Sequence, residues 1–258
     1  MFAVDVGNSF TRVVAFSGDR IVDRRSLPTR GMTVEDAAAA FEALKGDASG
    51  GDVYVSSVAP GVNAVLDAAA QRLGLTRRFI KPGRDVILPH RLTTPETTGA
   101  DRLLSALAAG RHLFSPEQIR DGYVVVQCGS AATVDLVDAA GVFVGGYIIP
   151  GPVLWLSGIS AAAQLPDFSS EVPDWNDVAP GDNTRSAILH GMAVTLPGAV
   201  ATAASGLASG FGADGRRPVA VTGGWGEAVA RLLPDDRVYD ADLVLHGVRL
   251  FAEQEARA

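Results

Sequence analysis

Hydrophobic and polar residues follow two different periods along the first half of the chain. Short runs rich in β-branched residues predict strands, and apolar residues three or four positions apart predict helices. The first three predicted strands are joined by short turns, so we expect them to form an antiparallel meander. On this basis we expect strands at 1–6, 11–16, 21–27, 52–57 and 78–80, and helices at 33–44, 61–73 and 99–114.

The same order of elements starts again in the second half. Three predicted strands are again joined by short turns, and segments with a helical period follow them. We expect strands at 123–128, 132–138, 142–149 and 218–222, and helices at 153–164, 184–209, 227–232 and 241–255.

This repeated order of meander, helix, strand and helix predicts an α/β fold with mixed sheets and an internal duplication. A purely parallel Rossmann-type sheet is disfavoured, because each half opens with hairpins. We expect the halves at 1–116 and 117–258, with a linker near 115–122. Three further segments are expected to be loops, two at the surface (46–51 and 211–217) and a mobile one rich in Pro, Asp and Ser (166–182).

Each half contains a turn rich in Gly and in hydroxyl or amide residues, directly after a buried strand. The first reads VDVGNSFT from Val4 to Thr11, and the second reads VVVQCGSAATVDLV from Val124 to Val137. Gly lets the backbone approach a ligand closely, and Asn, Ser and Thr add hydrogen bonds. One such turn is weak evidence, because many β-hairpins look like this. The pair predicts a nucleotide held between two similar halves.

Composition limits the partners of such a site. Of the 258 residues, 47% are hydrophobic and 20% are charged, which is an ordinary balance for a globular protein. The net charge is -7 and there is no basic block, so nucleic acid is not an expected partner. A phosphate site must therefore be local, made from backbone N–H groups and a few cations.

The single cysteine, Cys128, cannot form an internal disulfide, which is typical of a reducing cytoplasm. It lies in a buried-strand pattern, so a small core residue is favoured over a reactive thiol. Asp5 interrupts the N-terminal apolar run, so no signal peptide is expected. No apolar run reaches the ~18 residues that span a bilayer. We therefore expect a soluble, cytoplasmic protein without a membrane partner.

Asp5 ends the first predicted strand, where its carboxylate would face the same turn as a phosphate. A cation bound between the Asp5 carboxylate and the phosphate would offset their mutual repulsion, and Mg²⁺ takes oxygen ligands of this kind. The alternative is that Asp5 only caps the turn through backbone hydrogen bonds. The residue by itself favours neither interpretation.

The segment TTGADR opens a long helix, with Thr98 as its candidate N-cap. Asp101 in the first turn is favoured by the helix dipole, and this is its simpler role. The functional alternative is that Asp101 accepts a proton from a substrate hydroxyl. Arg102 beside it would then hold a carboxylate or a phosphate.

Other polar or flexible positions have two interpretations each. Gly223 and Gly224, in the sequence TGGW, either lie against an adenine or ribose or form a strand-to-helix turn. Asn183 and Thr184 open a helix, where they either bind a polar substrate or cap the helix. The four histidines show no metal spacing, and a zinc site is not expected.

Taken in order, the motifs DVGNS, GADR, the second glycine–hydroxyl turn, GGYIIPG, DNT and TGG resemble those of type III pantothenate kinases. The resemblance extends from Val4 to about Leu250. Those enzymes belong to the actin, sugar kinase and Hsp70 superfamily, so it implies two ribonuclease H-like halves. It also implies ATP-dependent phosphorylation of pantothenate to 4′-phosphopantothenate, the first step of coenzyme A biosynthesis. The family members are usually homodimers that need Mg²⁺ and a monovalent cation such as K⁺ or NH₄⁺.

The resemblance assigns roles to individual residues. A primary alcohol would attack the γ-phosphate in line while Asp101, as general base, removes its proton. Asp5 and Gln127 would stand at metal positions. The residues implied in ATP binding are Asp5, Val6, Gly7, Asn8, Ser9, Phe10, Thr11, Arg12, Gly129, Ser130, Gly223 and Gly224. The residues implied in pantothenate binding are Leu92, Gly99, Ala100, Asp101, Arg102 and Thr184.

Three positions depart from the family's pattern. The second turn usually reads DxGTATT, with an Asp that binds the monovalent cation. Gln127 stands there and keeps an oxygen ligand without the charge. Ala132 likewise replaces a hydroxyl residue. Leu92 stands where the family usually has a Tyr that touches the substrate, which implies a changed or enlarged pocket.

Three functions stay open at the level of the sequence. The first is an active pantothenate kinase. The second is a non-catalytic nucleotide-binding relative that acts as a regulator or as half of a hetero-dimer. The third is a kinase for another small alcohol. The pantothenate pocket lies near the dimer interface in the family, so the oligomeric state bears on activity.

Overall fold

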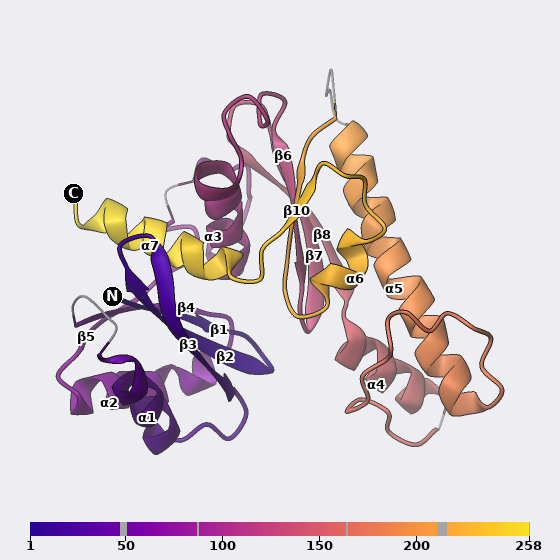
Figure 1. Ribbon diagram of the computed structural model, residues 1–258, viewed down its shortest axis with the longest axis horizontal. Coiled ribbons are helices and arrows are strands. Elements are labelled where there is room, and N and C mark those ends of the chain that lie inside the picture. The colour runs from indigo at the N-terminus through magenta and orange to yellow at the C-terminus, as the bar shows by residue number, and fades with distance from the viewer. Residues whose placement is uncertain (47–50, 87, 164, 211–215, 258) are drawn as a thin grey trace. The chain divides into compact units, whose positions relative to one another are not determined.

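The computed structural model describes residues 1–46, 51–86, 88–163, 165–210 and 216–257. These residues form two compact units. The first consists of Met1–Ala108 with Leu243–Ala258, and the second of Ala109–Asp242. Each unit is built around one five-stranded sheet (Figure 1).

The sheet of the first unit has the order β3–β2–β1–β4–β5. Strands β1, β2 and β3 are antiparallel neighbours, as the predicted meander requires, whereas β4 and β5 run parallel to β1. The elements of this unit are β1 (Phe2–Val6), β2 (Phe10–Ser17), β3 (Arg20–Pro28), α1 (Val34–Leu44), β4 (Asp52–Ser57), η1 (Pro60–Val62), α2 (Asn63–Arg72), β5 (Thr76–Phe79), η2 (Pro95–Thr97), α3 (Ala100–Ala108) and α7 (Leu243–Glu255).

Helices cover both faces of this first sheet. The face that carries Phe2 packs on α1 and α2, and the ring of Phe2 meets that of Phe41 edge-on at 5.6 Å. The opposite face packs on α7, where the rings of Phe16 and His246 meet at 5.6 Å. Figure 1 shows α7 running beside α3, and the two helices are in contact. The sheet is therefore the middle layer of three.

Helix α1 begins with a capping box. The hydroxyl of Thr33 accepts a hydrogen bond from the Asp36 amide at 3.1 Å, and the Asp36 carboxylate accepts one from the Thr33 amide at 2.9 Å. These bonds from Thr33 lower the pKa of Asp36. The predicted N-cap at Thr33 is thus confirmed, and the box satisfies amides that the helix leaves unpaired.

The sheet of the second unit repeats the order of the first as β8–β7–β6–β9–β10. Each strand has its counterpart, because β6, β7 and β8 form an antiparallel meander and β9 and β10 run parallel to β6. The predicted α/β fold with an internal duplication is therefore confirmed. The elements are η3 (Ala109–Leu113), β6 (Tyr123–Cys128), β7 (Ala131–Val137), β8 (Phe143–Pro150), α4 (Pro152–Ala162), α5 (Thr184–Ser209), β9 (Val219–Thr222), α6 (Gly226–Ala230) and β10 (Arg237–Tyr239).

Helix α5 is the main core helix of the second unit. Its buried residues include Met192, Leu196 and Val200, and they pack against β6 and β7. By length and composition alone it is also the one described helix that is long and apolar enough to cross a membrane, with a mean hydropathy of 1.5. The sequence reading found no such segment, because Thr, Gly and Ser interrupt its apolar residues. Of the apolar window, 44% is buried, and the buried side chains belong to the core of the second unit.

The compact units differ from the expected halves, 1–116 and 117–258. Helix α7, expected in the C-terminal half, packs on α3 and on β1 and β4 of the first unit. The first boundary falls between Ala108 and Ala109, inside a continuous helical segment, and not in the expected linker at 115–122. The C-terminal helix therefore belongs to the second half of the sequence but packs in the first compact unit.

The expectation of a surface loop at 211–217 is wrong for Arg217, which is only 3% exposed. Its guanidinium donates to the carbonyls of Asp121 at 2.6 Å, Leu207 at 2.9 Å and Gly210 at 2.5 Å. Leu207 lies in the last turn of α5 and Gly210 directly follows the helix, where helical carbonyls lack intrahelical partners. Residues 211–215, and residues 47–50 of the expected loop 46–51, lie outside the described part of the chain.

The segment 166–182 contacts the helices around it through aromatic and charged side chains. The ring of Trp175 stacks on that of Trp225 with centroids 5.4 Å apart. His190 of α5 lies 3.2 Å from the Asp177 carboxylate. The mobility that its composition predicts stays a prediction.

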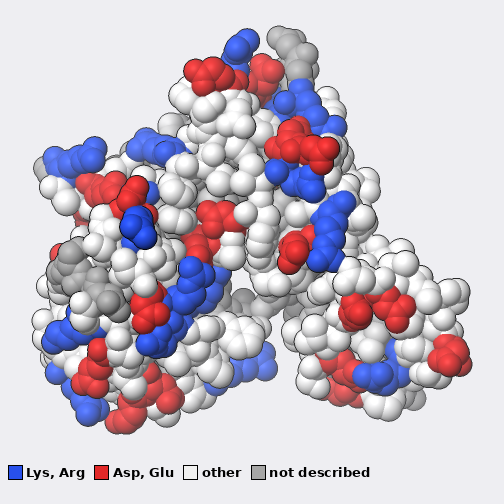
Figure 2. All heavy atoms as spheres, viewed as in Figure 1, with Lys and Arg blue, Asp and Glu red and all other residues white. Residues whose placement is uncertain are grey.

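Charged side chains do not gather by sign on the visible face. Figure 2 shows Lys and Arg interspersed with Asp and Glu. This distribution agrees with the net charge of -7 and with the lack of a basic block in the sequence.

Candidate active site

The first glycine–hydroxyl turn joins β1 to β2. Asp5 and Arg12 are register partners across this hairpin, so their side chains lie on the same face of the sheet. The Arg12 guanidinium donates to the Asp5 carboxylate at 2.7 Å, and the two side chains are 30% and 12% exposed. Among the described residues, the partner of Asp5 is thus a side chain and not the turn backbone. The hairpin register could have predicted this pair.

Internal hydrogen bonds hold the turn itself. The amide of Gly7 donates to the Phe10 carbonyl at 3.0 Å. The hydroxyls of Thr11 and Thr29 lie 3.0 Å apart, and Thr29 donates to the Gly7 carbonyl at 2.8 Å. The side chains of Val6 and Thr11 are fully buried, so either residue would reach a ligand only through its backbone. Thr29 is a support of this turn that the sequence reading missed.

The tip of the turn is open to solvent. Asn8 and Ser9 are exposed, and the Phe10 side chain is 61% exposed. An exposed aromatic ring beside exposed amide and hydroxyl groups is suited to contact with a ligand. The side chains of this turn that point outward are therefore those at its tip.

Helix α3 brings the GADR segment to the same edge of the first sheet. The position of Gly99 lies near Val58, whose amide donates to the carbonyl of Val6 at the end of β1 at 3.0 Å. Asp101 is in the first turn of the helix, and its Oδ1 accepts a hydrogen bond from the Arg102 amide at 2.9 Å. The Asp101 carboxylate thus lies at the helix N-terminus, where the helix dipole favours a negative charge.

Gly99 leaves the space that the Asp101 carboxylate occupies. A methyl group at position 99 would lie under 3.0 Å from Asp101 Oδ1, a separation that real Cβ atoms do not adopt. Helix α3 begins at Ala100, so Gly99 and not Thr98 stands directly before it. Ala100 is buried, and Leu92 is half-buried in the segment that precedes the helix.

The second glycine–hydroxyl turn joins β6 to β7, and three motifs meet at its backbone. The amide of Gly129 donates to the Ala131 carbonyl at 3.1 Å, and the amide of Gly151 donates to the Ser130 carbonyl at 3.1 Å. The indole of Trp225 donates to the Gly129 carbonyl at 2.8 Å. GGYIIPG and TGGW therefore both support this turn.

Gly223 lies directly against the strand that leads into the second turn. Its φ is +96°, and a side chain there would lie under 3.0 Å from the backbone of Cys128. Gly224, next to it, is exposed. Cys128 is fully buried, which raises the pKa of its thiol, so the prediction of a core cysteine is confirmed.

An open pocket of about 550 Å³ adjoins this part of the second unit. One of its lining residues, Tyr239, contacts the Gly223 turn, because the Tyr239 hydroxyl donates to the Gly223 carbonyl at 3.1 Å. Two arginines, a carboxylate and an aromatic ring give the pocket polar and planar surfaces. Its lining residues are Glu227, Ala230, Arg231, Arg237 and Tyr239.

Asn183 caps helix α5. Its side chain accepts a hydrogen bond from the Ser186 amide at 3.0 Å, and the Ser186 hydroxyl accepts one from the Asn183 amide at 3.2 Å. Of the two roles considered for this residue, helix capping is thus confirmed. Thr184 is the first residue of the helix and is exposed.

The residues at the implied metal positions offer oxygen atoms. Asp5 supplies a carboxylate, and the Ser56 hydroxyl on the neighbouring strand is buried without a hydrogen-bond partner among the described residues. Gln127 accepts a hydrogen bond from Thr133 at 3.5 Å, and the hydroxyl of its register partner Thr222 has no hydrogen-bond partner in the described part of the chain. The chemistry fits Mg²⁺ at Asp5 and a monovalent cation with neutral oxygen ligands at Gln127.

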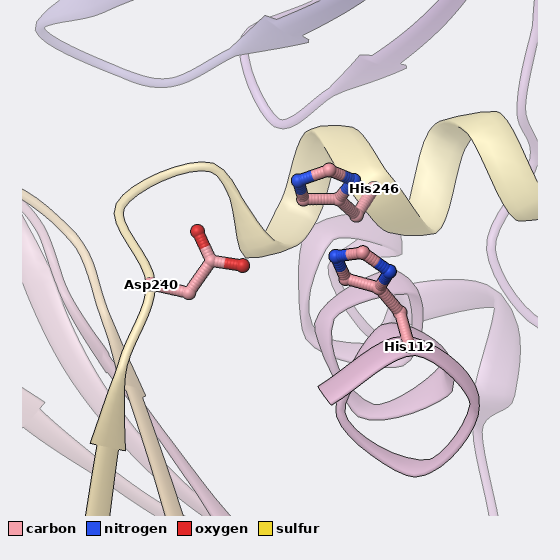
Figure 3. A group of neighbouring side chains, drawn as sticks. All are labelled: His112, Asp240 and His246. Carbon is pink, nitrogen blue, oxygen red and sulfur yellow. The ribbon is translucent and has the colours of Figure 1, made fainter. Parts of the chain in front are cut away.

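Three other side chains with metal-ligating groups come from two different units. Figure 3 shows His112 on η3, Asp240 in the connection after β10 and His246 on α7. His112 and Asp240 belong to the second unit, whereas His246 belongs to the first. The ring of His246 already packs on that of Phe16.

Comparisons with known proteins identify similar sequences and a similar fold. A sequence profile described as type III pantothenate kinase matches residues 1–205. A type III pantothenate kinase from Rubrobacter xylanophilus is 32% identical to the chain, and the match covers 100% of this chain and 99% of that protein. Another from Thermomicrobium roseum is 30% identical and covers 100% and 98%.

A solved structure shows the same fold at lower identity. It is a ROK family glucokinase from Streptomyces griseus in complex with glucose and AMPPNP, with a TM-score of 0.54 and 13% identity. The match covers 98% of this chain and 99% of that one. The chain thus has the duplicated α/β fold of the actin-like ATPases and sugar kinases.

Proposed function

The chain belongs to the type III pantothenate kinase family, and from that premise we propose that it phosphorylates pantothenate with ATP. The product is 4′-phosphopantothenate, and the reaction is the first step of coenzyme A biosynthesis. One observation carries the proposal: the 32% identity to a type III pantothenate kinase covers 100% of this chain and 99% of that protein.

Asp101 is our candidate for the general base. Its carboxylate is held by the Arg102 amide at 2.9 Å, at a helix N-terminus, and Gly99 leaves it room. A positioned carboxylate can remove the proton of the pantothenate alcohol as that oxygen attacks the γ-phosphate. The Arg102 side chain, next in sequence, is our candidate partner for the pantothenate carboxylate, because a guanidinium binds a carboxylate through two parallel hydrogen bonds.

The two glycine–hydroxyl turns are our candidates for the phosphate-binding loops. In the first turn, Arg12 supplies a cation that pairs with Asp5 in this structure, and Asn8 and Ser9 supply polar groups at the tip. In the second, the exposed Gly129 and the neighbouring Ser130 present backbone and hydroxyl groups. Gly223 and Gly224 would lie along the nucleoside part, beside the pocket that Tyr239 lines.

We propose Mg²⁺ at Asp5 and a monovalent cation at Gln127. Bound Mg²⁺ neutralises charge that develops on the transferring phosphoryl group. Gln127 provides only a neutral oxygen, so we expect K⁺ or NH₄⁺ to bind weakly there or to be dispensable. Leu92 would shape the acceptor pocket without a hydroxyl group.

We also propose a homodimer formed through the second unit. Strand β8 is an edge strand of its sheet, and apolar side chains on β8 and on the adjoining α4 are exposed. Ile148 is 67% exposed and Leu154 is 54% exposed, which is unusual for a surface that only meets water. Sedimentation of the purified chain at several concentrations tests this point.

The single buried cysteine agrees with a place in the cytoplasm, which we also propose.

ADP release separates the three functions that the sequence leaves open. The purified chain is given ATP and Mg²⁺, with K⁺, NH₄⁺ or Na⁺, and with pantothenate or other small alcohols in turn. We expect pantothenate-dependent ADP release that is lost in Asp101→Asn. Release with another alcohol alone would favour a different acceptor, and nucleotide binding without any release would favour a non-catalytic relative.

A further inference from the structure

Two buried hydroxyl groups have no hydrogen-bond partner among the described residues. They belong to Ser56 on β4 and Thr222 on β9, which are 0% and 1% exposed. Buried polar groups in proteins are almost always paired, so each exception calls for a physical reason. The two residues lie in different units and far apart in the sequence.

Their positions in the duplicated fold are equivalent. Ser56 is the register partner of Asp5 on the parallel pair β1–β4, and Thr222 is the register partner of Gln127 on the parallel pair β6–β9. Register partners on neighbouring strands point to the same face of a sheet. Asp5 and Gln127 are equivalent as well, because each stands two residues before the glycine that opens its turn.

Each unit therefore carries a row of three polar side chains across three strands. In the first unit the row is Ser56, Asp5 and Arg12, and in the second it is Thr222, Gln127 and Thr133.

In both rows the central side chain bonds to its partner on the hairpin strand and not to the hydroxyl on the parallel strand. Arg12 bonds Asp5 at 2.7 Å, and Thr133 bonds Gln127 at 3.5 Å, which is a long hydrogen bond. A carboxylate or amide oxygen accepts more than one hydrogen bond, so both central groups have capacity for the second partner.

We propose that Ser56 and Thr222 are positioning residues of the two phosphate turns, and that they bond Asp5 and Gln127 when a nucleoside triphosphate is bound. In the first unit, a phosphate attracts the Arg12 guanidinium away from Asp5. The Asp5 carboxylate then turns to the Ser56 hydroxyl, which holds it toward the ligand. In the second unit, the weak bond from Thr133 gives way to one from Thr222. This inference rests on the proposed function, since it takes the ligand to be a nucleotide.

An idle hydroxyl would behave differently from a positioning one. Removal of a buried hydroxyl that never finds a partner leaves the protein equally stable or more stable, and it leaves ligand affinity unchanged. Removal of a positioning hydroxyl has the same effect on the unliganded protein, but it weakens nucleotide binding. The two cases therefore separate when stability and affinity are measured on the same variants.

The experiment uses the full chain with Mg²⁺ and AMPPNP, a nucleotide that resists hydrolysis, and measures Kd by calorimetry and unfolding by thermal denaturation. Thr222→Val removes the hydroxyl at constant shape, and Thr222→Ser retains it. Ser56→Ala is the corresponding change in the first unit. Ser160→Ala is the control, because that hydroxyl accepts a bond from the Phe168 amide at 3.3 Å in a buried site of α4.

We expect Ser56→Ala to raise Kd about ten-fold, the loss typical of one hydrogen bond to a charged group. Thr222→Val should raise Kd a few-fold, and Thr222→Ser should restore it. Neither Ser56→Ala nor Thr222→Val should lower the unliganded Tm, whereas Ser160→Ala should lower Tm and leave Kd unchanged.

Unchanged Kd in Ser56→Ala and Thr222→Val would overturn the proposal. If Ser56→Ala does not fold, the Thr222 pair decides alone. A wild-type chain that binds no nucleotide overturns both the proposal and the proposed function. Nucleotide binding without pantothenate phosphorylation overturns only the proposed function.

Discussion

Substitution of Gly99 by Ala tests the geometry around Asp101 with a single added methyl group. The φ of Gly99 is not in the left-handed region, so an Ala can adopt the backbone conformation without strain. Its Cβ would nevertheless lie under 3.0 Å from Asp101 Oδ1. The carboxylate must therefore move by on the order of 1 Å, and its bond to the Arg102 amide must stretch or break.

A displacement of this size has a large effect on rate and a small one on stability. A misplacement of about 1 Å at a reacting group can cost roughly 100-fold in rate, which corresponds to about 2.7 kcal/mol of transition-state stabilisation. A Gly to Ala change in a compatible backbone stabilises a fold by ~0.4–1 kcal/mol, which offsets part of the local clash. We therefore expect Gly99→Ala to lower kcat about 100-fold while the free energy of unfolding changes by less than ~1 kcal/mol.

The assay is steady-state ADP release with varied pantothenate, together with urea unfolding of each variant. Gly61→Ala is the matched control, because no atom lies within 4 Å of the added methyl group. The KM for pantothenate should change little, since the Arg102 side chain is intact. A Gly99→Ala enzyme with a kcat near the wild-type value would refute the reasoning, as would an equal loss in Gly61→Ala.

Three further predictions concern stability and reactivity. Arg217→Met should lower the free energy of unfolding by ~3 kcal/mol, because three backbone carbonyls, one buried and two partly buried, lose a charged donor. Arg216→Met, which removes an exposed ion pair with Asp236, should lower the free energy of unfolding by less than ~0.5 kcal/mol in the same urea titration. Equal losses in the two variants would contradict the structural role given to Arg217. Cys128 should resist iodoacetamide at pH 8 until the chain is unfolded, because burial raises the pKa of its thiol, and fast labelling of the native protein would contradict this. The pKa of Asp36 is lower in the folded chain than the ordinary value of 3.8, so its stabilising contribution is complete above about pH 4 and is lost as the pH falls through the folded pKa. The loss of stability between pH 7 and pH 3 should therefore be smaller in Asp36→Asn, and an equal loss would argue against the capping box.

Local patterns predicted the elements of this fold well, because the physics that determines them is also local. The capping residue Thr33 and the strand Asp52–Ser57 are at the predicted positions, since each depends on a few neighbouring residues. The short strand β10 (Arg237–Tyr239) was missed, because three residues carry no visible period. Its pairing with β9 comes from the tertiary structure.

Contacts between distant segments could not be predicted in the same way. The hydrophobic period of α7 does not indicate that this helix packs on α3, which lies more than a hundred residues earlier in the sequence. Arg217 looks like a loop residue in the sequence, and only the position of the α5 carbonyls explains its burial. The sequence shows that a strand carries a polar residue, but it does not show whether another group in the fold forms a hydrogen bond with that side chain.

The site was predictable to the extent that its residues lie in short motifs. Asp5, Gly99 and Asp101 were selected from DVGNS and GADR, and the structure places both segments at one edge of the first sheet. Ser56 and Thr222 belong to no such motif. Their interest appears only when register, burial and missing partners are considered together.

Direct detection of the product tests the central claim most simply. The purified chain is incubated with ATP, Mg²⁺, K⁺ and pantothenate, and the mixture is analysed by mass spectrometry for a phosphorylated pantothenate. We predict that the wild-type chain forms 4′-phosphopantothenate and that Asp101→Asn, folded and able to bind nucleotide, forms almost none. A folded wild-type chain that binds nucleotide and yields no such product, or an Asp101→Asn variant as active as the wild type, would contradict the account.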